Sequence, residues 1–348
     1  MSQCSKYIYL QLLLHAHESV HETFAFLTLS LYTYISGFVN IWKEAWQAGL
    51  PKHLEAYDSG STSGDIEYAL MNLFQYCQLA IYGCGENLKF LCPMVQSYVK
   101  RALQYNVRLI IYPLGVLHQL VYDLMGVKEN ALSICSAGMN EESLFFQSRA
   151  NNNAAMCRTI FVKKKYEAFF HGDLEEAARA YDLCTSFLTP TTGRQIGIIV
   201  SFFIDGMIGF FHARKRNEDE AKWTNVGKES INLLRKWVVS SEWNFSNKLF
   251  LLEAEYYFLN GDDERAVDSY HNSIKAAHEH RFIHEEGLAE EKLASYLIRK
   301  SRHDEAMTHY VNAKKCYDAW GAQSVLDRID KIIALLLPLC TQNRELAQ

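Results

Sequence analysis

The residues best suited to chemistry form a short motif near the N-terminus, His17-Glu18-Ser19-Val20-His21. On a helix this spacing places two imidazoles one turn apart beside a carboxylate, which is the arrangement that zinc hydrolases use. A third ligand is needed, and Glu44, 23 residues after His21, is the candidate. The metzincin continuation would need Gly and His where Phe24 and Leu27 stand. The favoured hypothesis is therefore that the two histidines lie on the partly exposed face of a repeat helix. Zinc hydrolysis is the alternative.

A second cluster contains His278, His280, His284 and Glu285. His280 and His284 lie one turn apart if this stretch is helical, and no cysteine is near. Because histidine titrates close to neutral pH, a structural or pH-sensitive role is one possibility. We expect instead solvated histidines at the edge of a helical repeat.

The sequence lacks the motifs of nucleotide, kinase and hydrolase chemistry. Gly227-Lys228 is followed by Glu229 and has no upstream glycine, so no phosphate-binding loop is formed. No kinase glycine-rich loop, His-Arg-Asp, Asp-Phe-Gly or nucleophile elbow occurs. We therefore assign no catalytic, cofactor-binding or metal-binding residue, and predict that the chain is not an enzyme.

Composition restricts the class of partner and the compartment. The 348 residues are 49% hydrophobic and 22% charged with a net charge of −5, which is typical of an ordinary folded protein. Nucleic acid is not an expected partner, because no basic surface is clustered and Lys163-Lys164-Lys165 is expected on a solvated helix face. Nine irregularly spaced cysteines without a C-x-x-C pair predict reduced, buried thiols and a cytoplasmic protein.

Two apolar segments are long enough to raise the question of a membrane span. The first, 23–42, is free of charge but rich in polar residues, and the second, 196–211, carries Asp205 near its centre. Mean hydropathy over the chain is −0.14. We expect both segments to be buried helices, with no membrane partner.

The apolar residues recur at the spacing of helices that pack in pairs. Leu249, Leu252, Tyr256 and Leu259 fall on one stripe, and only five prolines interrupt the whole chain. Three segments then share one order: an apolar helix, a polar turn, and a second helix that opens with an alanine. Their turns and alanines are His171-Gly172-Asp173 with Ala177, Asn260-Gly261-Asp262 with Ala266, and Ser301-Arg302-His303-Asp304 with Ala306, and a looser copy starts at Gly64-Asp65.

This order predicts stacked antiparallel hairpins. Glycine adopts the left-handed conformation that ends a helix, aspartate caps the next one, and alanine allows close approach. One hairpin cannot bury both of its faces, so neighbours must stack into a continuous core. The spacing from Gly261 to Ser301 is 40 residues, slightly longer than the tetratricopeptide period, and a less regular unit is expected from Gly206 to Trp237.

The predicted fold class is therefore all-α: an α-α superhelix of stacked antiparallel helix hairpins of the tetratricopeptide type. A single array is expected over residues 1–340, followed by a C-terminal tail at 341–348. An irregular helical bundle is the alternative. Trp320 is expected to be a large core residue and Gly321 a helix stop, while Phe282 to Glu286 is expected to cross between hairpins.

Residues 242–330 contain the most specific sequence. The elements are Glu242-Trp243-Asn244-Phe245-Ser246-Asn247-Lys248, the run from Ala276 to Ala289 that contains Phe282-Ile283-His284-Glu285-Glu286-Gly287, and Cys316-Tyr317-Asp318-Ala319-Trp320-Gly321-Ala322. They resemble the helical repeat region that follows the AAA-type ATPase module in giant signalling proteins. Those proteins also carry a serine/threonine kinase-like domain, a GAF sensor domain and a histidine kinase.

The resemblance implies a non-catalytic protein–protein interaction module or regulatory scaffold in signal transduction. Its implied partner is a protein or peptide, or neighbouring ATPase and kinase domains. The chain being a fragment of a larger ATPase and histidine kinase signalling protein is the alternative. Because none of the catalytic motifs occurs here, the enzymatic activities of that family do not transfer, and no contact residue is assigned.

Overall fold

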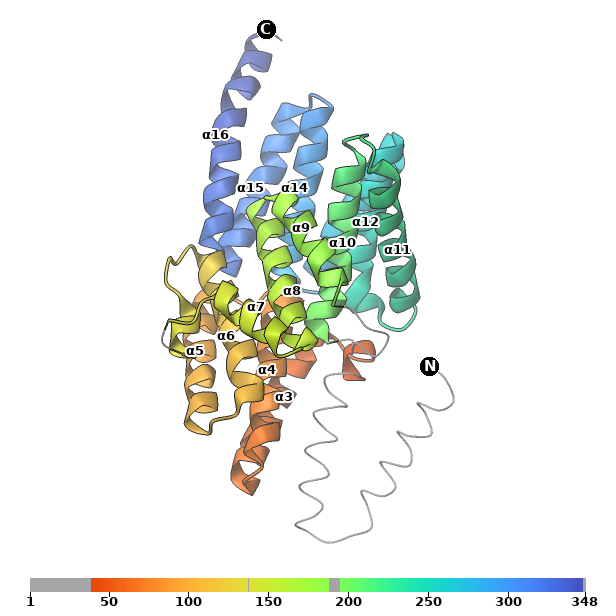
Figure 1. Ribbon diagram of the computed structural model, residues 1–348. Helices are drawn as coiled ribbons and strands as arrows, with labels where there is room; N and C mark the ends of the chain where they lie inside the picture. The colour runs from red at the N-terminus through yellow and green to blue at the C-terminus, as the bar shows by residue number, and fades with distance from the viewer. Residues whose placement is uncertain (1–38, 137, 188–194, 347–348) are drawn as a thin grey trace.

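The computed structural model describes residues 39–136, 138–187 and 195–346. Within these residues the chain forms fourteen α-helices and no strand (Figure 1). Neighbouring helices pack in consecutive pairs. The predicted all-α superhelix of helix hairpins is therefore confirmed.

Six hairpins make up most of the described chain. They are α3 (Trp46–Ser63) with α4 (Ile66–Gln78), α5 (Leu88–Gln104) with α6 (Arg108–Met125), α8 (Ala154–His171) with α9 (Leu174–Thr185), α10 (Ile196–Ala213) with α11 (Glu220–Val238), α12 (Glu242–Asn260) with α13 (Asp263–Glu279), and α14 (Ile283–Arg299) with α15 (His303–Trp320). The remaining elements are α7 (Glu141–Ala150), α16 (Gln323–Leu346) and three short turns of helix, η1 (Asn40–Trp42), η2 (Leu79–Cys84) and η3 (Ala131–Ile134). Helix α16 thus continues through most of the predicted tail.

The predicted turns end helices as expected. Gly172, Gly261 and Gly321 follow α8, α12 and α15 with φ of 80°, 74° and 83°, and Ser301 adopts φ 59° after α14. Positive φ of this kind favours glycine, so Ser301 is the exception. Asp173 and Asp262 each accept a hydrogen bond from a backbone N–H three residues on, at 2.9 and 3.2 Å. These two caps start α9 and α13.

The alanines that open the second helices lie in the core of the hairpins. Ala177, Ala266 and Ala306 are each fully buried. Burial of the small methyl group agrees with the role predicted for these alanines, which is to let two helices approach closely.

The unit expected from Gly206 to Trp237 is also a hairpin, but it begins earlier, at Ile196. Gly206 and Gly209 do not mark a turn. They lie inside α10, and a Cβ on Gly209 would sit 2.8 Å from the backbone nitrogen of Gly227 in α11. The sequence prediction placed this boundary wrongly because a glycine at a helix crossing resembles a glycine at a turn.

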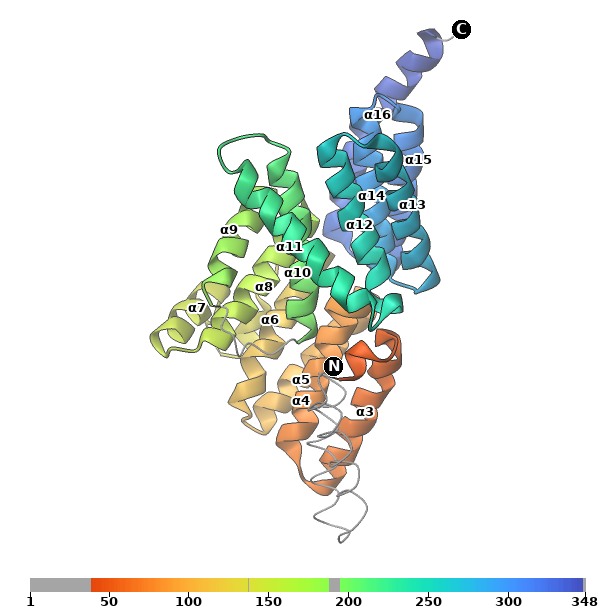
Figure 2. The same ribbon diagram turned by 90° about the vertical axis from the view of Figure 1, so that its right-hand side faces the viewer.

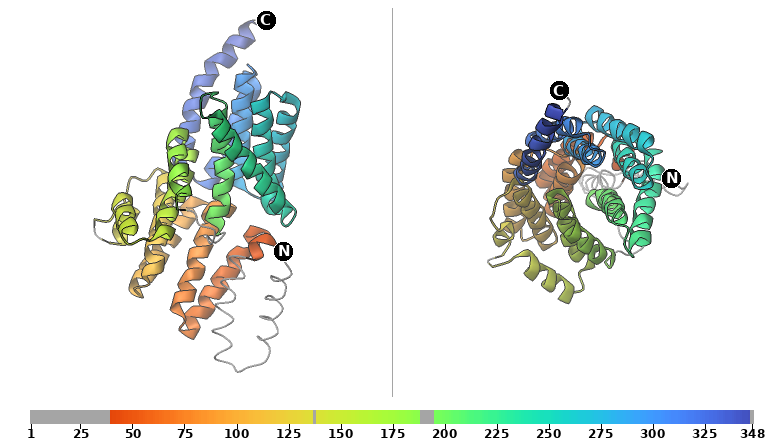
Figure 3. Two further views of the ribbon diagram at one scale, coloured as in Figure 1. Left: turned by 45° about the vertical axis from the view of Figure 1, so that its right-hand side comes forward. Right: turned by 90° about the horizontal axis from the view of Figure 1, so that it is seen from above.

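The hairpins curve until the last helices meet the first ones. Figure 2 shows α12 to α16 on one side of the molecule and α7 to α9 on the other, and the view from above shows helices around a common centre (Figure 3). Helix α16 contacts α6 and α8. The Ser324 hydroxyl of α16 donates to the carbonyl of Leu124 in α6 at 2.8 Å. Arg328 of α16 donates to the carbonyl of Phe170 in α8 at 3.1 Å. The superhelix is therefore closed, and its inner face is filled by side chains.

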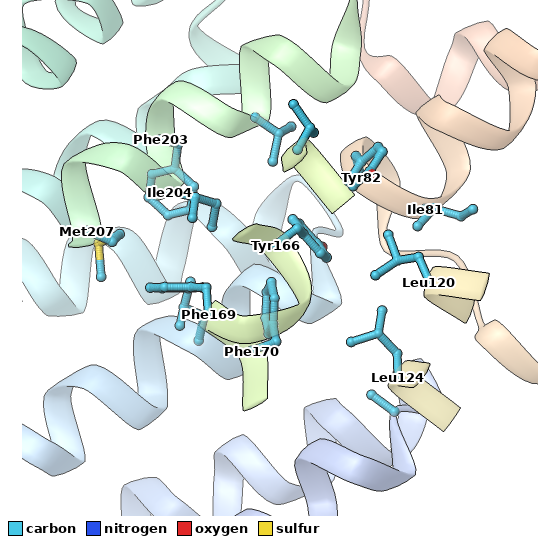
Figure 4. Close-up of a cluster of buried hydrophobic side chains, with 14 of the residues drawn as sticks. Ile81, Tyr82, Leu120, Leu124, Tyr166, Phe169, Phe170, Phe203, Ile204 and Met207 are labelled. Atoms are coloured by element: carbon cyan, nitrogen blue, oxygen red, sulfur yellow. The ribbon is translucent and has the colours of Figure 1, made fainter. Parts of the chain in front are cut away.

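Aromatic side chains of α8 fill much of that interior. Tyr166, Phe169 and Phe170 lie among residues from η2, α6 and α10 (Figure 4). Tyr166 packs edge-on against Tyr82 with ring centroids 5.0 Å apart, and Phe170 contacts Trp320 at 5.1 Å. These contacts place the aromatic residues of α8 in the core and confirm that Trp320, which is fully buried, is a large core residue.

One described helix, α10, is long and apolar enough to cross a membrane by length and composition alone. In the structure 83% of this segment is buried inside the protein. The predicted buried helix at 196–211 is therefore confirmed. Of the other apolar segment, residues 23–38 lie outside the described residues.

Candidate functional site

The zinc-type motif His17-Glu18-x-x-His21 lies outside the described residues. Its suggested third ligand, Glu44, is described and forms an ion pair with Lys52 instead. No group of three or more histidine, cysteine, aspartate or glutamate side chains in the described ranges is arranged to hold a metal ion. The zinc hydrolase hypothesis therefore gains no support from the part of the chain that is placed.

Several of the residues that carry the family resemblance meet Trp46 and Tyr82 in one buried cluster. We call this cluster the hub and define it by Trp46 of α3, Tyr82 of η2, Lys248 of α12, Phe282 before α14, His284 and Glu285 of α14, and Trp320 of α15. Each of them is at most 2% exposed. The hub joins the first hairpin to the last ones, so these sequence elements hold the closed superhelix together.

Asn244 fixes the start of the described chain against α12. Its side-chain oxygen accepts the backbone N–H of Trp46 at 3.1 Å. Its amide nitrogen donates to the carbonyls of Ile41 and Glu44 at 3.2 and 2.7 Å. Phe245 beside it contacts the ring of Trp46 at 5.4 Å. All polar positions of this buried amide are therefore used for structure.

Lys248 is a buried cation held by one carboxylate and two aromatic rings. Its ammonium group lies 2.7 Å from Glu285, and 4.5 and 4.3 Å from the ring centroids of Trp46 and Phe282. Burial lowers the pKa of Lys248, although the attraction of Glu285 opposes this effect. Because both charged groups are nearly inaccessible, the pair has the geometry of a structural link rather than of a reacting lysine.

His284 contradicts the expectation of solvated edge histidines. It is 1% exposed, its Nε2–H donates to the carbonyl of Tyr82 at 3.4 Å, and its ring lies 5.4 Å from Trp320. Burial lowers its pKa to about 4. His280 is the residue after α13, whereas His284 belongs to α14, so the two are not one turn apart on a helix. The crossing between these hairpins is 280–282, shorter than predicted.

The lysine run at 163–165 was also predicted wrongly as a solvated face. Lys163 and Lys165 are 3% and 2% exposed. Lys163 lies 2.6 Å from both Asp123 and Glu167, and Lys165 pairs with Asp205 of α10. Glu167 is four residues from Lys163, but Asp123 and Asp205 come from distant parts of the chain, so the sequence around the lysines does not reveal these two partners.

The described cysteines offer no reactive thiolate. All eight are free, and all but the half-buried Cys92 are buried, as the sequence predicted. Burial raises the pKa of Cys77, Cys84 and Cys135, which keeps their thiols protonated at neutral pH.

The best candidate for a binding site is an open groove on the outside of the first half of the chain. It encloses about 370 Å³, within the range of ligand pockets. Helices α4, α6, α7 and α8 and the start of α10 form its walls (Figure 1). We call it the groove and define it by its lining residues Met71, Phe74, Arg108, Leu109, Ile110, Tyr112, Pro113, Leu144, Gln147, Ser148, Asn151, Asn153, Ala155, Met156, Arg158, Thr159 and Gln195.

The groove is built where helices begin. α6 starts at Arg108, α8 starts at Ala154, and Gln195 precedes α10. Asn153 caps α8 by accepting the backbone N–H of Met156 at 3.0 Å. The side of α7 that carries Leu144 and Ser148 closes the opposite wall.

Sequence reasoning did not identify the groove. Its residues are scattered from Met71 to Gln195, and none belongs to a recognisable motif. The one local feature that could have pointed to it is the polar run Asn151-Asn152-Asn153 between α7 and α8.

Comparison with known proteins assigns no family. No protein-family model matches the chain, and no curated protein matches it. The resemblance to the repeat region of multidomain signalling proteins stays a prediction.

Proposed function

We propose that this chain is a non-catalytic scaffold that binds a segment of another protein in the groove. The observation that carries the proposal is the groove itself: an open cavity of about 370 Å³ with apolar, amide and hydroxyl side chains along its walls. Binding sites for small ligands and peptides combine an apolar surface with a few polar groups in this way.

The closed superhelix supports the choice of an outer site. In stacked helical repeats the concave face is the usual place for a partner. Here that face is filled by the hub and by the aromatic residues of α8. A partner segment therefore has more room in the groove than at the centre of the superhelix.

A role in signal transduction, with an ATPase or kinase domain as the partner, remains part of the proposal on the basis of the sequence resemblance. The alternative that the chain is a fragment of such a multidomain protein remains as well. A cytoplasmic location is proposed from the eight free cysteines of the described chain, since oxidising compartments favour disulfides.

A substitution that fills the groove with a large side chain tests the proposal. A random peptide display library would be selected on the purified chain, and the enriched peptides measured against Ala155→Trp. Ala155 is the exposed second residue of α8 and lines the groove, so an indole there occupies the cavity without entering the core. We expect binding to weaken by about tenfold or more, because the peptide loses its contact surface.

The matched control is Ala221→Trp, since Ala221 is the exposed second residue of α11 and lies outside the groove. It should bind the selected peptides like the wild type. Failure to enrich any peptide, or equal binding by Ala155→Trp, contradicts the proposal.

A further inference from the structure

The charges that line the groove are of one sign. Arg108 and Arg158 are its only charged residues, and none of the described lining residues is acidic. The chain as a whole contains 40 acidic residues and carries a net charge of −5. A positively charged groove in an acidic protein is therefore a local departure from the composition.

The two arginines stand at different depths. Arg108 is exposed, and its guanidinium forms no hydrogen bond or ion pair with the part of the chain that the structure describes. Arg158 is partly buried and donates to the carbonyl of Phe187 at 3.3 Å. Burial lowers the pKa of Arg158. Arg108 is thus available to an incoming anion, and Arg158 is the second basic residue in the lining, held by its own contacts.

Three helix N-termini add to this positive potential. Residues of the first turns of α6 and α8 and the residue before α10 all line the groove. Each of these helices is 18 residues long, and neither α6 nor α10 has a described side chain that caps it. The N-terminal end of a helix carries about half a positive elementary charge and exposes backbone N–H groups, so all three ends favour an anionic ligand.

The rest of the lining is not that of a site for a bare ion. Phe74, Ile110, Leu144 and Met156 are buried side chains that form an apolar floor, and Leu109 is 61% exposed at the rim. Amide groups follow the walls, and these can donate to and accept from a peptide backbone. Apolar side chains on the ligand would be stabilised by contact with this apolar lining.

We infer that the groove binds an acidic, partly apolar segment of a partner protein, with a carboxylate on Arg108 and large apolar side chains on the floor. This inference rests on the proposed function and names the class of its ligand. Arginine binds carboxylates through two parallel N–H donors, which makes Arg108 the contact that selects for charge.

Two peptide libraries with opposite charge test the inference. One mixes Asp and Glu with Leu, Phe, Ser and Gly, and the other replaces the acids by Lys and Arg. Both would be selected in parallel on the wild-type chain, and the enriched peptides would be measured by fluorescence anisotropy. We expect the acidic library alone to be enriched, with binding that weakens between about 50 and about 200 mM salt, because screening weakens exposed charge pairs.

The charge variants give the decisive comparison. Arg108→Gln should weaken binding of the acidic peptides by about threefold to tenfold, and Arg108→Glu by more than about tenfold, because reversal adds repulsion. Arg149→Glu is the control: Arg149 is exposed on the neighbouring helix α7, lies outside the groove, and changes the net charge equally. It should bind within about twofold of the wild type.

The outcomes separate this inference from the proposed function. If basic peptides are enriched and bind Ala155→Trp more weakly than the wild type, the groove remains a binding site but its ligand is not acidic. Equal binding of the acidic peptides by wild type and Arg108→Glu would also overturn the acidic ligand. So would tighter binding of a labelled oligothymidine than of any selected peptide. Enrichment of neither library contradicts both proposals.

Discussion

At the scale of single residues, burial changes what the polar side chains do. Lys248 and Lys165 belong to a residue type that usually faces water and His284 to one of intermediate burial, yet each is almost inaccessible here. Their partners, Tyr82, Glu285 and Asp205, lie 37 or more residues away along the chain. The sequence was sufficient to single out His284 as a candidate for chemistry. It did not predict the burial or the partners of these three residues, because both depend on which helices become neighbours.

The buried histidine predicts acid sensitivity. The pKa of His284 is lowered to about 4 in the folded chain, against an ordinary value of 6.5. Between these values the unfolded chain binds a proton that the folded chain does not, so the free energy of unfolding falls as the pH is lowered through this window. Glu285 and Lys248, the charged groups beside the ring, have opposing effects on this titration. One histidine with this shift contributes up to about 3 kcal/mol, fully present above the window and lost below it.

His284→Gln isolates this contribution. Urea unfolding of the wild type and the variant at a series of pH values should show a shallower dependence in the variant, by about 1.4 kcal/mol per pH unit inside the window. Burial also lowers the pKa values of His53 and His118 to about 4, and these two histidines contribute equally to the pH dependence of unfolding in both proteins. Identical slopes in the two proteins would show that His284 does not titrate as its burial requires.

At the scale of elements, the sequence predicted hairpins well where a turn motif marks them. Gly172, Gly261 and the alanines that follow define their helix ends and contacts by local geometry, which is why a pattern of a few residues is sufficient. The boundary at Gly206 and the link after His280 were misplaced, because a helix crossing and a short link are set by packing between hairpins. The groove could not be predicted for the same reason, since four helices and the start of a fifth form it.

The crossing of α10 and α11 yields a test of that packing. A Cβ on Gly209 would meet the backbone of Trp223 and Gly227 at 2.8 Å, and backbone cannot move aside as a side chain can. Gly209→Ala should therefore lower the free energy of unfolding by about 1–3 kcal/mol despite the better helix propensity of alanine. Thermal and urea unfolding measure this difference.

Gly49→Ala is the matched control for this crossing. A Cβ at Gly49 in α3 would meet only the end of the Leu79 side chain, at 3.0 Å, and that end can rotate. We expect this variant to be neutral or slightly more stable than the wild type, by up to about 1 kcal/mol. Equal destabilisation by both alanines would indicate that helix spacing at the crossing is not fixed by Gly209.

At the scale of the whole molecule, closure of the superhelix is the property that the sequence did not predict. Stacked hairpins were expected, but nothing in their order indicated that α16 would reach α6 and α8. Glu291 of α14, Phe170 of α8 and Arg328 of α16 meet at this contact, from three separate hairpin regions. Closure brings α16 against α6 and α8, and the proposed function therefore places the partner in the groove and not at the centre of the superhelix.

Arg328 provides the test of closure. Its guanidinium binds both oxygens of Glu291 at 2.7 and 2.8 Å, and although burial alone would raise the pKa of this carboxyl, the arginine lowers it to about 2. Arg328→Met leaves Glu291 buried without its charge partner, which should lower the free energy of unfolding by about 3–5 kcal/mol at neutral pH. Lys314→Met, which removes an exposed ion pair between the neighbouring helices α15 and α16, should lower the free energy of unfolding by less than about 1 kcal/mol.

Hydrogen exchange should then locate the change in Arg328→Met. Protection should fall first in α16 and in the ends of α6 and α8 that face it. Helices α10 to α13 should remain protected, because each hairpin is stabilised mainly by its neighbours. A uniform loss of protection along the described helices would mean that the superhelix unfolds as one unit and that α16 does not act as a separate closing element.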